Sequence, residues 1–335
     1  IWTGCKRFST LAAVMTRKLV VEPISGKTFG AVITGVSLAD LCDEEWLQIE
    51  RAFNQYALLI FPEQFVNSDS QVAFARRFGE LEFEKSAMSN HISKEGAPLS
   101  LDSDVMQINL GNEFWHTDST YQPISSKAGL LSARTLPAAG GQTEFADMRA
   151  AYDALDQATR SRIAKLSAYH SNEYSQANDI GHFPPKGLSD RIYHGEAYLR
   201  PLVKVHPATG RRSLMLGRHA FGIPGLAREE WRRLVATLNL RSCSEDSARY
   251  EHQWRSGDLV VWDNRCLLHR ARPYDYSAGR RFLLGSRVLG DARSEAALPP
   301  PDPAAGRRAL AEELRLLRAE RAVRGGSADA PRAAL

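Results

Sequence analysis

Short runs of β-branched, aromatic and leucine residues, separated by turns, recur along most of this chain and constrain its fold more than any other feature. Such runs occupy residues 18–40, 57–63, 104–110, 129–136, 202–217, 248–254, 258–263 and 280–288. Helical spacing of apolar residues is concentrated at residues 43–56, 68–81, 147–168 and 227–239. Strands and helices therefore do not alternate as they do in parallel α/β proteins. The pattern predicts a mainly β protein with a sandwich-type core and helices packed outside.

Composition divides the chain into three parts. Residues 1–17 are basic and contain no acid, which is typical either of an organellar leader or of a remnant before a start at Met15, and we expect them to be disordered. Residues 18–298 contain the predicted strands and form one expected domain. Residues 299–335 begin with a proline-rich linker, continue as a predicted helix at 307–324 and end in a tail that we expect to be disordered.

The net charge of +4 does not indicate a nucleic-acid-binding surface. Residues 1–21 contribute +4 and residues 304–335 contribute +3, so the body between them carries −3. A basic balance that comes from two tails offers no stripe of positive charge along which a phosphate backbone could bind. We therefore expect no nucleic-acid partner.

Cysteine use and hydropathy favour a reducing compartment without membrane insertion. The four cysteines, Cys5, Cys42, Cys243 and Cys266, show no CxxC spacing, which argues against a zinc ribbon and a disulfide framework. No stretch approaches the roughly 18 consecutive apolar residues that a transmembrane helix needs. We expect a cytoplasmic protein with no membrane partner, and organellar targeting by residues 1–15 is the weaker alternative.

The segment Trp115-His116-Thr117-Asp118 is the first pattern that carries chemistry. In an extended segment, residues two apart project to the same side, so His116 and Asp118 can present an imidazole and a carboxylate to one metal ion. His269, at the end of the β-rich run VVWDNRCLLH, is the best candidate for a third ligand. Two histidines and one carboxylate leave three positions open on an octahedral ion, which suits ferrous iron that must bind a bidentate co-substrate and O₂.

A threonine and two arginines form a second pattern, which suits a carboxylate ligand. Thr143 lies in GGQTEFAD, and Arg280 and Arg281 follow His269. An arginine fork donates two parallel hydrogen bonds to a carboxylate, and a threonine hydroxyl adds a third. Such a clamp can hold the far carboxylate of 2-oxoglutarate while the keto-acid end chelates iron.

Two other interpretations stay open. A zinc-dependent hydrolase can use the same three ligands, although the sequence offers no evident general base and leaves the carboxylate clamp unexplained. A non-catalytic jelly-roll binding protein would retain both patterns without using them. Metal analysis and O₂ uptake that depends on 2-oxoglutarate separate these interpretations from an iron oxygenase.

Three segments resemble the taurine and 2,4-dichlorophenoxyacetate dioxygenase family, namely NLGNEFWHTDSTYQP, LLSARTLPAAGGQTEFADMRAAYDAL and WRSGDLVVWDNRCLLHRARPYD. The likeness runs from about Leu19 to Asp291. It implies a double-stranded β-helix, or jelly roll, and an enzyme that oxidises a small organic substrate while 2-oxoglutarate and O₂ yield succinate and CO₂. The implied site residues are His116, Asp118 and His269 for iron, and Thr143, Arg281, the less favoured Arg280 and Trp262 for 2-oxoglutarate.

One position departs from the family pattern and bears on the substrate. Family members that cleave herbicides or taurine carry an arginine four residues after the co-substrate arginine, where it grips the anionic group of the substrate. Here that position is Gly285, so we expect a substrate other than phenoxyacetate or taurine. Arg287 is a candidate replacement, but two residues further along a strand it lies roughly 6.6 Å away. Related halogenases lack the carboxylate ligand so that chloride can bind. Asp118 therefore favours hydroxylation, or a cleavage, desaturation or cyclisation derived from it.

Substrate contacts are expected near the metal segment and in residues 171–200, a polar and aperiodic segment long enough to form a lid. The candidates are Asn109, Ser119 and Tyr121 beside the metal ligands, and His170, His182 and His194 in or next to the lid. An ordinary structural role is the competing interpretation for each of them. The family resemblance further implies a homo-oligomer, either a dimer or a tetramer.

Overall fold

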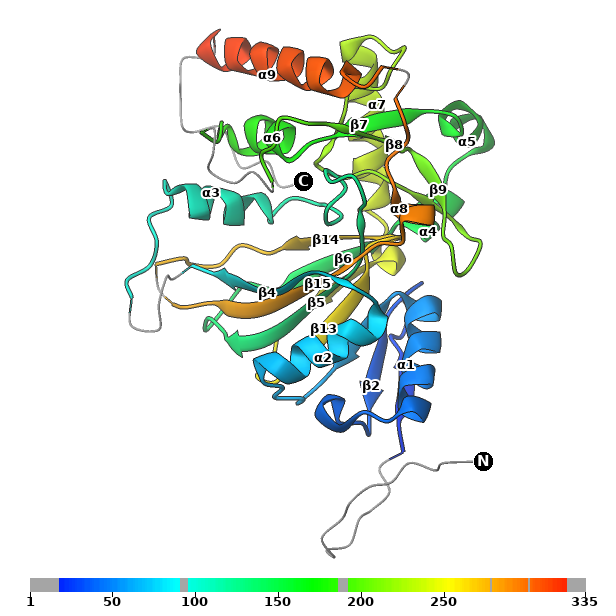
Figure 1. Ribbon diagram of the computed structural model, residues 1–335, viewed down its shortest axis with the longest axis vertical. Helices are drawn as coiled ribbons and strands as arrows, with labels where there is room; N and C mark the ends of the chain where they lie inside the picture. Colours follow the sequence, from blue (N-terminus) through cyan, green and yellow to red (C-terminus); the bar gives the residue numbers. More distant parts are fainter. Residues whose placement is uncertain (1–17, 91–95, 186–191, 278, 301, 324–335) are drawn as a thin grey trace, which may run out of the picture.

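A seven-stranded sheet is the largest layer of the computed structural model, which describes residues 18–90, 96–185, 192–277, 279–300 and 302–323 (Figure 1). Its strands pair antiparallel except for β2 with β3. In spatial order they are β1 (Val20–Pro23), β2 (Ala31–Thr34), β3 (Leu58–Phe61), β13 (Leu259–Asp263), β5 (Ser126–Thr135), β15 (Phe282–Leu289) and β4 (Leu81–Ser89). The predicted leader and terminal tail lie outside the described residues.

A second sheet packs against the inner face of the first. Its strands, in spatial order, are β12 (Arg249–His252), β6 (Thr143–Asp147) and β14 (Leu267–Ala271). Phe145 and Leu267 from this sheet share a buried cluster with Val260 and Trp262 of β13. The two sheets thus enclose an apolar interior, and the predicted mainly β jelly-roll core with flanking helices is confirmed.

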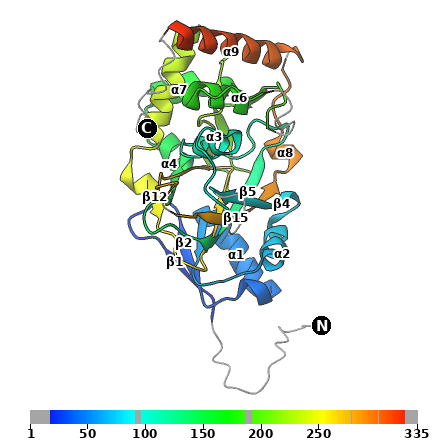
Figure 2. The ribbon, with the colours of Figure 1, turned by 90° about the vertical axis from the view of Figure 1, so that its left-hand side faces the viewer.

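Two helices cover the outer face of the large sheet, α1 (Asp43–Tyr56) and α2 (Ser68–Phe78) (Figures 1 and 2). Their aromatic side chains pack edge to face, and Trp46 and Phe78 have ring centroids 4.8 Å apart. Helix α2 stops at Gly79, two residues before the end of the predicted range. Asp43 is the first helical residue of α1. Cys42 occupies the cap position, and the Glu45 carboxylate accepts a hydrogen bond from its backbone N–H.

A third layer lies on the other side of the core, beyond the small sheet, and the C-terminal helix forms its outer end (Figures 1 and 2). It contains the sheet β11 (Ala220–Phe221), β7 (Ser167–His170) and β8 (Tyr198–Pro201), and the hairpin of β9 (Val203–Val205) and β10 (Arg212–Leu214). Its longer helices are α3 (Asp104–Gly111), α7 (Arg228–Ser242) and α9 (Ala305–Val323). Its shorter helices are α4 (Met148–Asp153), α5 (Gln157–Ile163), α6 (Asn172–Ser175) and the π-helix η2 (Gln176–Ile180). The remaining short elements of the chain are η1 (Leu38–Asp40), η3 (Asp246–Ala248) and α8 (Ala292–Glu295).

Three sequence predictions in this layer were wrong or incomplete. Residues 104–110 form helix α3 and not a strand, because Ser103 caps the backbone N–H of Met106 and starts a helix. The single helix predicted at 147–168 is divided into α4, α5 and strand β7, and Asp156 caps the second helix. The predicted lid at 171–200 contains α6 and η2 in its described part, so it is more regular than expected.

None of the helices in the described ranges combines the length and apolar character that crossing a bilayer requires.

Candidate active site

Two segments far apart in the chain meet at the mouth of the small sheet. The backbone N–H of His116 donates to the carbonyl of His269 at 3.0 Å, and the N–H of His269 donates to the carbonyl of His116 at 2.8 Å. This bridge sets the two imidazole rings 4.1 Å apart, centroid to centroid. The ligand atoms of His116, Asp118 and His269 all lie within 4.8 Å of one another. The predicted metal triad is therefore assembled in space.

The loop after His116 brings Asp118 to the same place, although not by the predicted route. His116 forms an isolated β-bridge, residues 118–121 form a turn, and Ser119 has a left-handed φ of 56°. The hydroxyl of Thr117 donates to the carbonyl of Leu267 at 3.1 Å, which anchors this turn to β14. The Asp118 Oδ2 atom then lies 3.7 Å from Nε2 of His269. A β-bridge at His116, followed directly by a turn pinned to β14, aligns the imidazole with the carboxylate.

The electrostatics of the triad favour metal binding. Burial lowers the pKa of His116 to about 4 and that of His269 to about 3, so both imidazoles are neutral and keep a lone pair for a metal. Burial alone would raise the pKa of Asp118, but the Arg287 guanidinium and the hydrogen bond from Asn264 lower it overall, so the carboxylate is ionised. Nδ1 of His116 lies 2.7 Å from the carbonyl oxygen of Phe114, which leaves Nε2 for coordination.

Both oxygens of Asp118 have a further partner. Arg287 Nη2 lies 2.5 Å from Oδ1 and its Nη1 donates to the Ser119 hydroxyl at 3.1 Å. Asn264 Nδ2 donates to Oδ2 at 3.1 Å, and the indole N–H of Trp262 donates to Asn264 at 2.9 Å. These bonds fix the carboxylate in one orientation.

A small cavity of about 80 Å³ opens between the triad and the two predicted co-substrate residues, Thr143 and Arg281. Trp262 also lines it, as predicted. The Thr143 hydroxyl accepts a hydrogen bond from the indole of Trp254 at 3.0 Å, so its own hydrogen is available to a carboxylate. Arg281 is buried, and its Nε donates to the carbonyl of Gly141 at 3.0 Å. That bond directs the guanidinium and leaves its terminal nitrogens for a ligand.

Arg280 lies outside this cavity. It is only half-buried, and its guanidinium stacks over the ring of Phe282 at 5.3 Å. The structure therefore brings Arg281, and not Arg280, to the triad.

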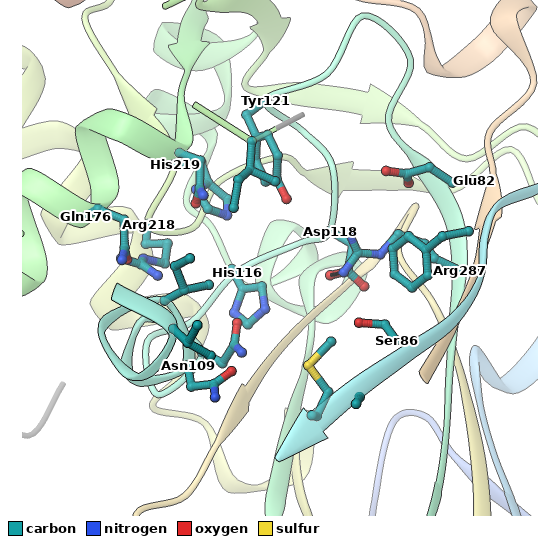
Figure 3. A pocket seen from close by; sticks show the side chains of 18 of the residues that line it. Glu82, Ser86, Asn109, His116, Asp118, Tyr121, Gln176, Arg218, His219 and Arg287 are labelled. Atoms are coloured by element: carbon teal, nitrogen blue, oxygen red, sulfur yellow. Dashed lines mark hydrogen bonds and ion pairs between the residues drawn. The ribbon is translucent and has the colours of Figure 1, made fainter. Parts of the chain in front are cut away.

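A larger cavity of about 360 Å³ lies on the other side of the triad and is open to the outside (Figure 3). Asn109 on α3 and Tyr121 line it, as predicted. Ser119 does not, because its hydroxyl donates to Glu82 at 2.7 Å and accepts from Arg287. His116 and Asp118 face both cavities, so a substrate in the larger one would contact a co-substrate in the smaller one.

Among the polar residues of the larger cavity that sequence reasoning missed are Arg218, His219 and Gln176 (Figure 3). Arg218 Nε donates to Asp179 at 2.9 Å and Nη2 donates to Gln176 at 2.7 Å. Its Nη1 occupies the space where a Cβ at Gly111 would lie, so this glycine makes room for the guanidinium. Arg218 and His219 follow a hairpin without any motif spacing, so the sequence offered no pattern from which to select them.

The three candidate histidines of the predicted lid do not line this cavity. His170 is fully buried in β7. Nε2 of His182 lies 2.9 Å from a carboxylate oxygen of Asp104, and Nε2 of His194 lies 3.0 Å from the carbonyl of Tyr121. Their structural interpretation is the better one.

A second group with metal-ligating atoms, His206, Asp263 and Cys266, is a hydrogen-bonded core network. The Asp263 carboxylate accepts two bonds from Arg265, at 2.8 Å and 2.6 Å, and lies 3.0 Å from Nε2 of His206. Burial raises the pKa of the Cys266 thiol, so it stays protonated. These atoms are already satisfied without a metal.

Comparison with known proteins places this geometry among oxygenases. The family described as "Taurine catabolism dioxygenase TauD, TfdA family" matches residues 21–287. The (S)-phenoxypropionate/alpha-ketoglutarate-dioxygenase of Sphingobium herbicidovorans is 49% identical over 282 residues, which cover 81% of this chain and 95% of that protein. The alpha-ketoglutarate-dependent 2,4-dichlorophenoxyacetate dioxygenase of Cupriavidus pinatubonensis is 36% identical over 289 residues, which cover 79% of this chain and 96% of that protein. The crystal structure of AAD-2 with Mn(II) and N-oxalylglycine has a TM-score of 0.77 at 37% identity and covers 84% of this chain and 100% of its own.

Proposed function

Because the chain belongs to the taurine catabolism dioxygenase TauD, TfdA family, we propose that it oxidises a small carboxylic acid with an aryl ether on its α-carbon, of the 2-phenoxypropionate type. The chain is an Fe(II)- and 2-oxoglutarate-dependent dioxygenase that acts on a small organic substrate. The zinc-hydrolase and binding-protein interpretations are therefore wrong.

His116, Asp118 and His269 are the proposed iron ligands. Two neutral imidazoles and one ionised carboxylate on one side of the site are the donor set that ferrous oxygenases use, with positions left open for other ligands. When bound, iron together with 2-oxoglutarate and O₂ supplies the oxidant that replaces a substrate C–H with C–OH. Asn264 and Arg287 orient the carboxylate for this role.

Thr143 and Arg281 are the proposed partners of the far carboxylate of 2-oxoglutarate. Both line the small cavity beside the triad, and Arg281 is buried. Among the described residues that line this cavity, Asp118 is the one carboxylate. Trp262 forms an aromatic wall of the same cavity. Arg280 is the less suited alternative because it faces away.

Arg218 is the proposed partner of the substrate carboxylate, and this residue is the single observation that carries the substrate class. Gly285 on β15 carries no side chain that could bind an anion, in keeping with the departure seen in the sequence. Arg218 supplies a guanidinium to the larger cavity from the segment after β10, where it is the proposed replacement that binds a substrate carboxylate. Tyr121 and His219, with ring centroids 4.9 Å apart, offer an aromatic surface beside it for the aryl group.

In this orientation the α-carbon of the substrate is the carbon presented to the metal site. One oxygen atom of O₂ enters the substrate at this carbon and the other enters succinate, while CO₂ leaves. The resulting hemiketal breaks its C–O bond, so the phenol departs with the hydroxyl proton and a 2-keto acid remains. The buried protein groups exclude water and hold the substrate during this step.

A substrate screen with a paired variant tests the proposal. We expect succinate formation with one enantiomer of 2-phenoxypropionate to exceed that with phenoxyacetate or taurine. Arg218→Gln should raise KM for the acid roughly 10-fold or more, because hydrogen bonds to charged groups contribute about 1.5–3 kcal/mol. Arg212→Gln removes an exposed arginine of β10 and should leave KM unchanged. An unchanged KM in Arg218→Gln, or a preference for uncharged substrates, would refute the proposal.

We also infer a homo-oligomer, a dimer or a tetramer, in a reducing compartment such as the cytoplasm. The oligomer rests on family resemblance. The compartment is supported by Cys243 and Cys266, which are buried thiols that form no disulfide. Light scattering coupled to size-exclusion chromatography measures the first point directly.

A further inference from the structure

A third cavity, of about 630 Å³, lies behind the wall that carries the metal ligands. Phe114 and Trp115, which directly precede His116, form part of its lining. Arg218 lines it as well as the proposed substrate cavity, so this one side chain lies between the two spaces. The third cavity is larger than the substrate cavity and contains none of the three proposed metal ligands.

One face of α7 forms the apolar side of this cavity. Its lining residues on that helix are Trp231, Arg232, Val235, Ala236, Asn239 and Leu240. Their spacing of three and four residues places them along a single stripe. Trp231 and Val235 are buried, whereas Leu240 has 60% of its surface exposed at the rim. The stripe gives the cavity an aromatic and aliphatic surface that is accessible from outside.

Arginines make up most of the charged side chains that line the cavity. Four arginines line it, and Asp179 is the single carboxylate among its described lining residues. Three of the arginines have close partners, because Arg218 pairs with Asp179 at 2.9 Å, Arg232 with Glu313 at 3.0 Å and Arg270 with Glu144 at 2.5 Å.

Arg249 is the fourth arginine and is less well matched. Its ion pair with Asp246 spans 4.0 Å, and 38% of its side chain is exposed. Asn239 also lines the cavity, and its Oδ1 accepts from the backbone N–H of Gly217 at 3.0 Å, which leaves its amide N–H groups available to an acceptor. Arg249 and Asn239 therefore offer donors to an anion.

We propose that this cavity is a second ligand site, which binds an aromatic monocarboxylate separately from the substrate. The carboxylate binds Arg249 and the Asn239 amide, and the ring packs on Trp231, Val235 and Leu240. An apolar cavity with a few convergent polar groups is the usual form of a small-molecule site. Of the four lining arginines, Arg249 has the longest ion pair, so its guanidinium favours an anion over a cation or a neutral ligand.

Because Arg218 borders both cavities, a ligand in the second site should also alter substrate binding. We expect 2-naphthoate to raise KM with little change in kcat. This link rests on the proposed role of Arg218 in the substrate cavity, whereas direct binding of 2-naphthoate does not. If 2-naphthoate binds but does not change KM, the proposed role of Arg218 in the substrate cavity is wrong, whereas the second site is retained.

Isothermal titration calorimetry with 2-naphthoate tests the site directly. The full chain is first loaded with Mn(II) and 2-oxoglutarate. Ala236→Trp places an indole in the cavity from an exposed helix position and should remove one binding site from the stoichiometry. Thr237→Trp is the matched control, because Thr237 is exposed on the same helix but does not line the cavity. It should bind as the parent does.

A second pair of variants tests the anion. Arg249→Gln should weaken the same binding event roughly 10-fold, because one charged hydrogen bond is lost. Arg233→Gln removes an exposed arginine of α7 outside the cavity and should have no effect. The proposal is overturned if 2-naphthoate does not bind the parent, or if Ala236→Trp and Thr237→Trp give the same isotherm. It is also overturned if Ala236→Trp changes only the oligomeric state, since a second copy of the chain would then cover the cavity.

Discussion

Arg280 and Arg281 are neighbours in the chain, yet only one of them reaches the active site. Arg281 is buried and its backbone N–H donates to Asn90 at 2.9 Å, just before β15 begins, whereas Arg280 is half-buried against Phe282. The sequence placed both after His269 at nearly the same spacing, so it left the pair ambiguous. The alternation of side chains at the entry to a strand decides between them.

This difference predicts a clear contrast between two conservative variants. Arg281→Gln should raise the Kd of 2-oxoglutarate roughly 10- to 100-fold, because a buried guanidinium bonded to a carboxylate contributes about 1.5–3 kcal/mol. Arg280→Gln should change it less than about 3-fold, as expected for a group outside the cavity. Equilibrium dialysis or titration calorimetry with Mn(II)-loaded protein measures both values. Equal effects in the two variants would contradict the assignment of Arg281.

Arg287 shows how one residue can be misjudged from its position in the sequence. It lies two residues beyond Gly285 on β15, where a replacement for the missing substrate arginine could be sought. Its guanidinium instead pairs with Asp118 and stacks over Phe83 at 4.7 Å. Its positive charge balances the negative charge of the Asp118 carboxylate. A pairing between residues so far apart in the chain cannot be recognised from the local sequence.

At the scale of elements, most strands could be predicted from the sequence, but helix α3 could not be separated from a strand by composition. The run DVMQINL is rich in apolar residues and contains valine and isoleucine, which favour strands. The cap at Ser103 and the burial of Met106 and Leu110, four residues apart, outweigh that preference. Both the cap and this spacing are visible in the sequence. The division of residues 147–168 into two helices and a strand depends instead on tertiary contacts.

Helix α9 supports the wall of the proposed substrate cavity, although it lies beyond the residues that match the family. Leu310 and Leu317 join a buried cluster with Tyr174 of α6 and Trp231 of α7. Glu313 accepts hydrogen bonds from Arg228 at 2.8 Å and 2.7 Å. Since α6 continues into η2, which carries Gln176 to the cavity, α9 fixes that wall from behind.

Weakening this contact should therefore affect both stability and substrate affinity. Leu317→Ala is expected to destabilise the protein by about 2–5 kcal/mol, as is usual for truncation of a buried leucine. It should also raise KM for the substrate while the Kd of Mn(II) stays unchanged. Leu316→Ala, at a half-buried position outside the cluster, should cost less than about 1 kcal/mol. Chemical denaturation and steady-state kinetics test the pair, and a KM unaffected by Leu317→Ala would separate α9 from the cavity wall.

At the scale of the whole molecule, the site joins segments that only the complete fold brings together. His269 lies on β14 of the small sheet, Thr143 on β6 beside it, and Arg281 immediately before β15 of the large sheet. His269, Thr143 and Arg281 could nevertheless be predicted from the sequence, because each lies in a segment that resembles the family. Arg218 could not, because it reaches the site through a backbone hydrogen bond to Trp115, at 2.8 Å, between segments without a shared pattern.

A metal that bridges such distant segments should stabilise the folded chain as a whole. A ligand present at 100 times its Kd adds about 2.7 kcal/mol to folding, so Mn(II) with 2-oxoglutarate should raise the Tm by several degrees. His269→Ala should abolish this increase, because the remaining His116 and Asp118 belong to one short turn. His182→Ala should retain it, since that histidine pairs with Asp104 outside the triad. Differential scanning calorimetry with and without Mn(II) makes the comparison. A Tm increase of equal size in His269→Ala would show that the ion binds elsewhere.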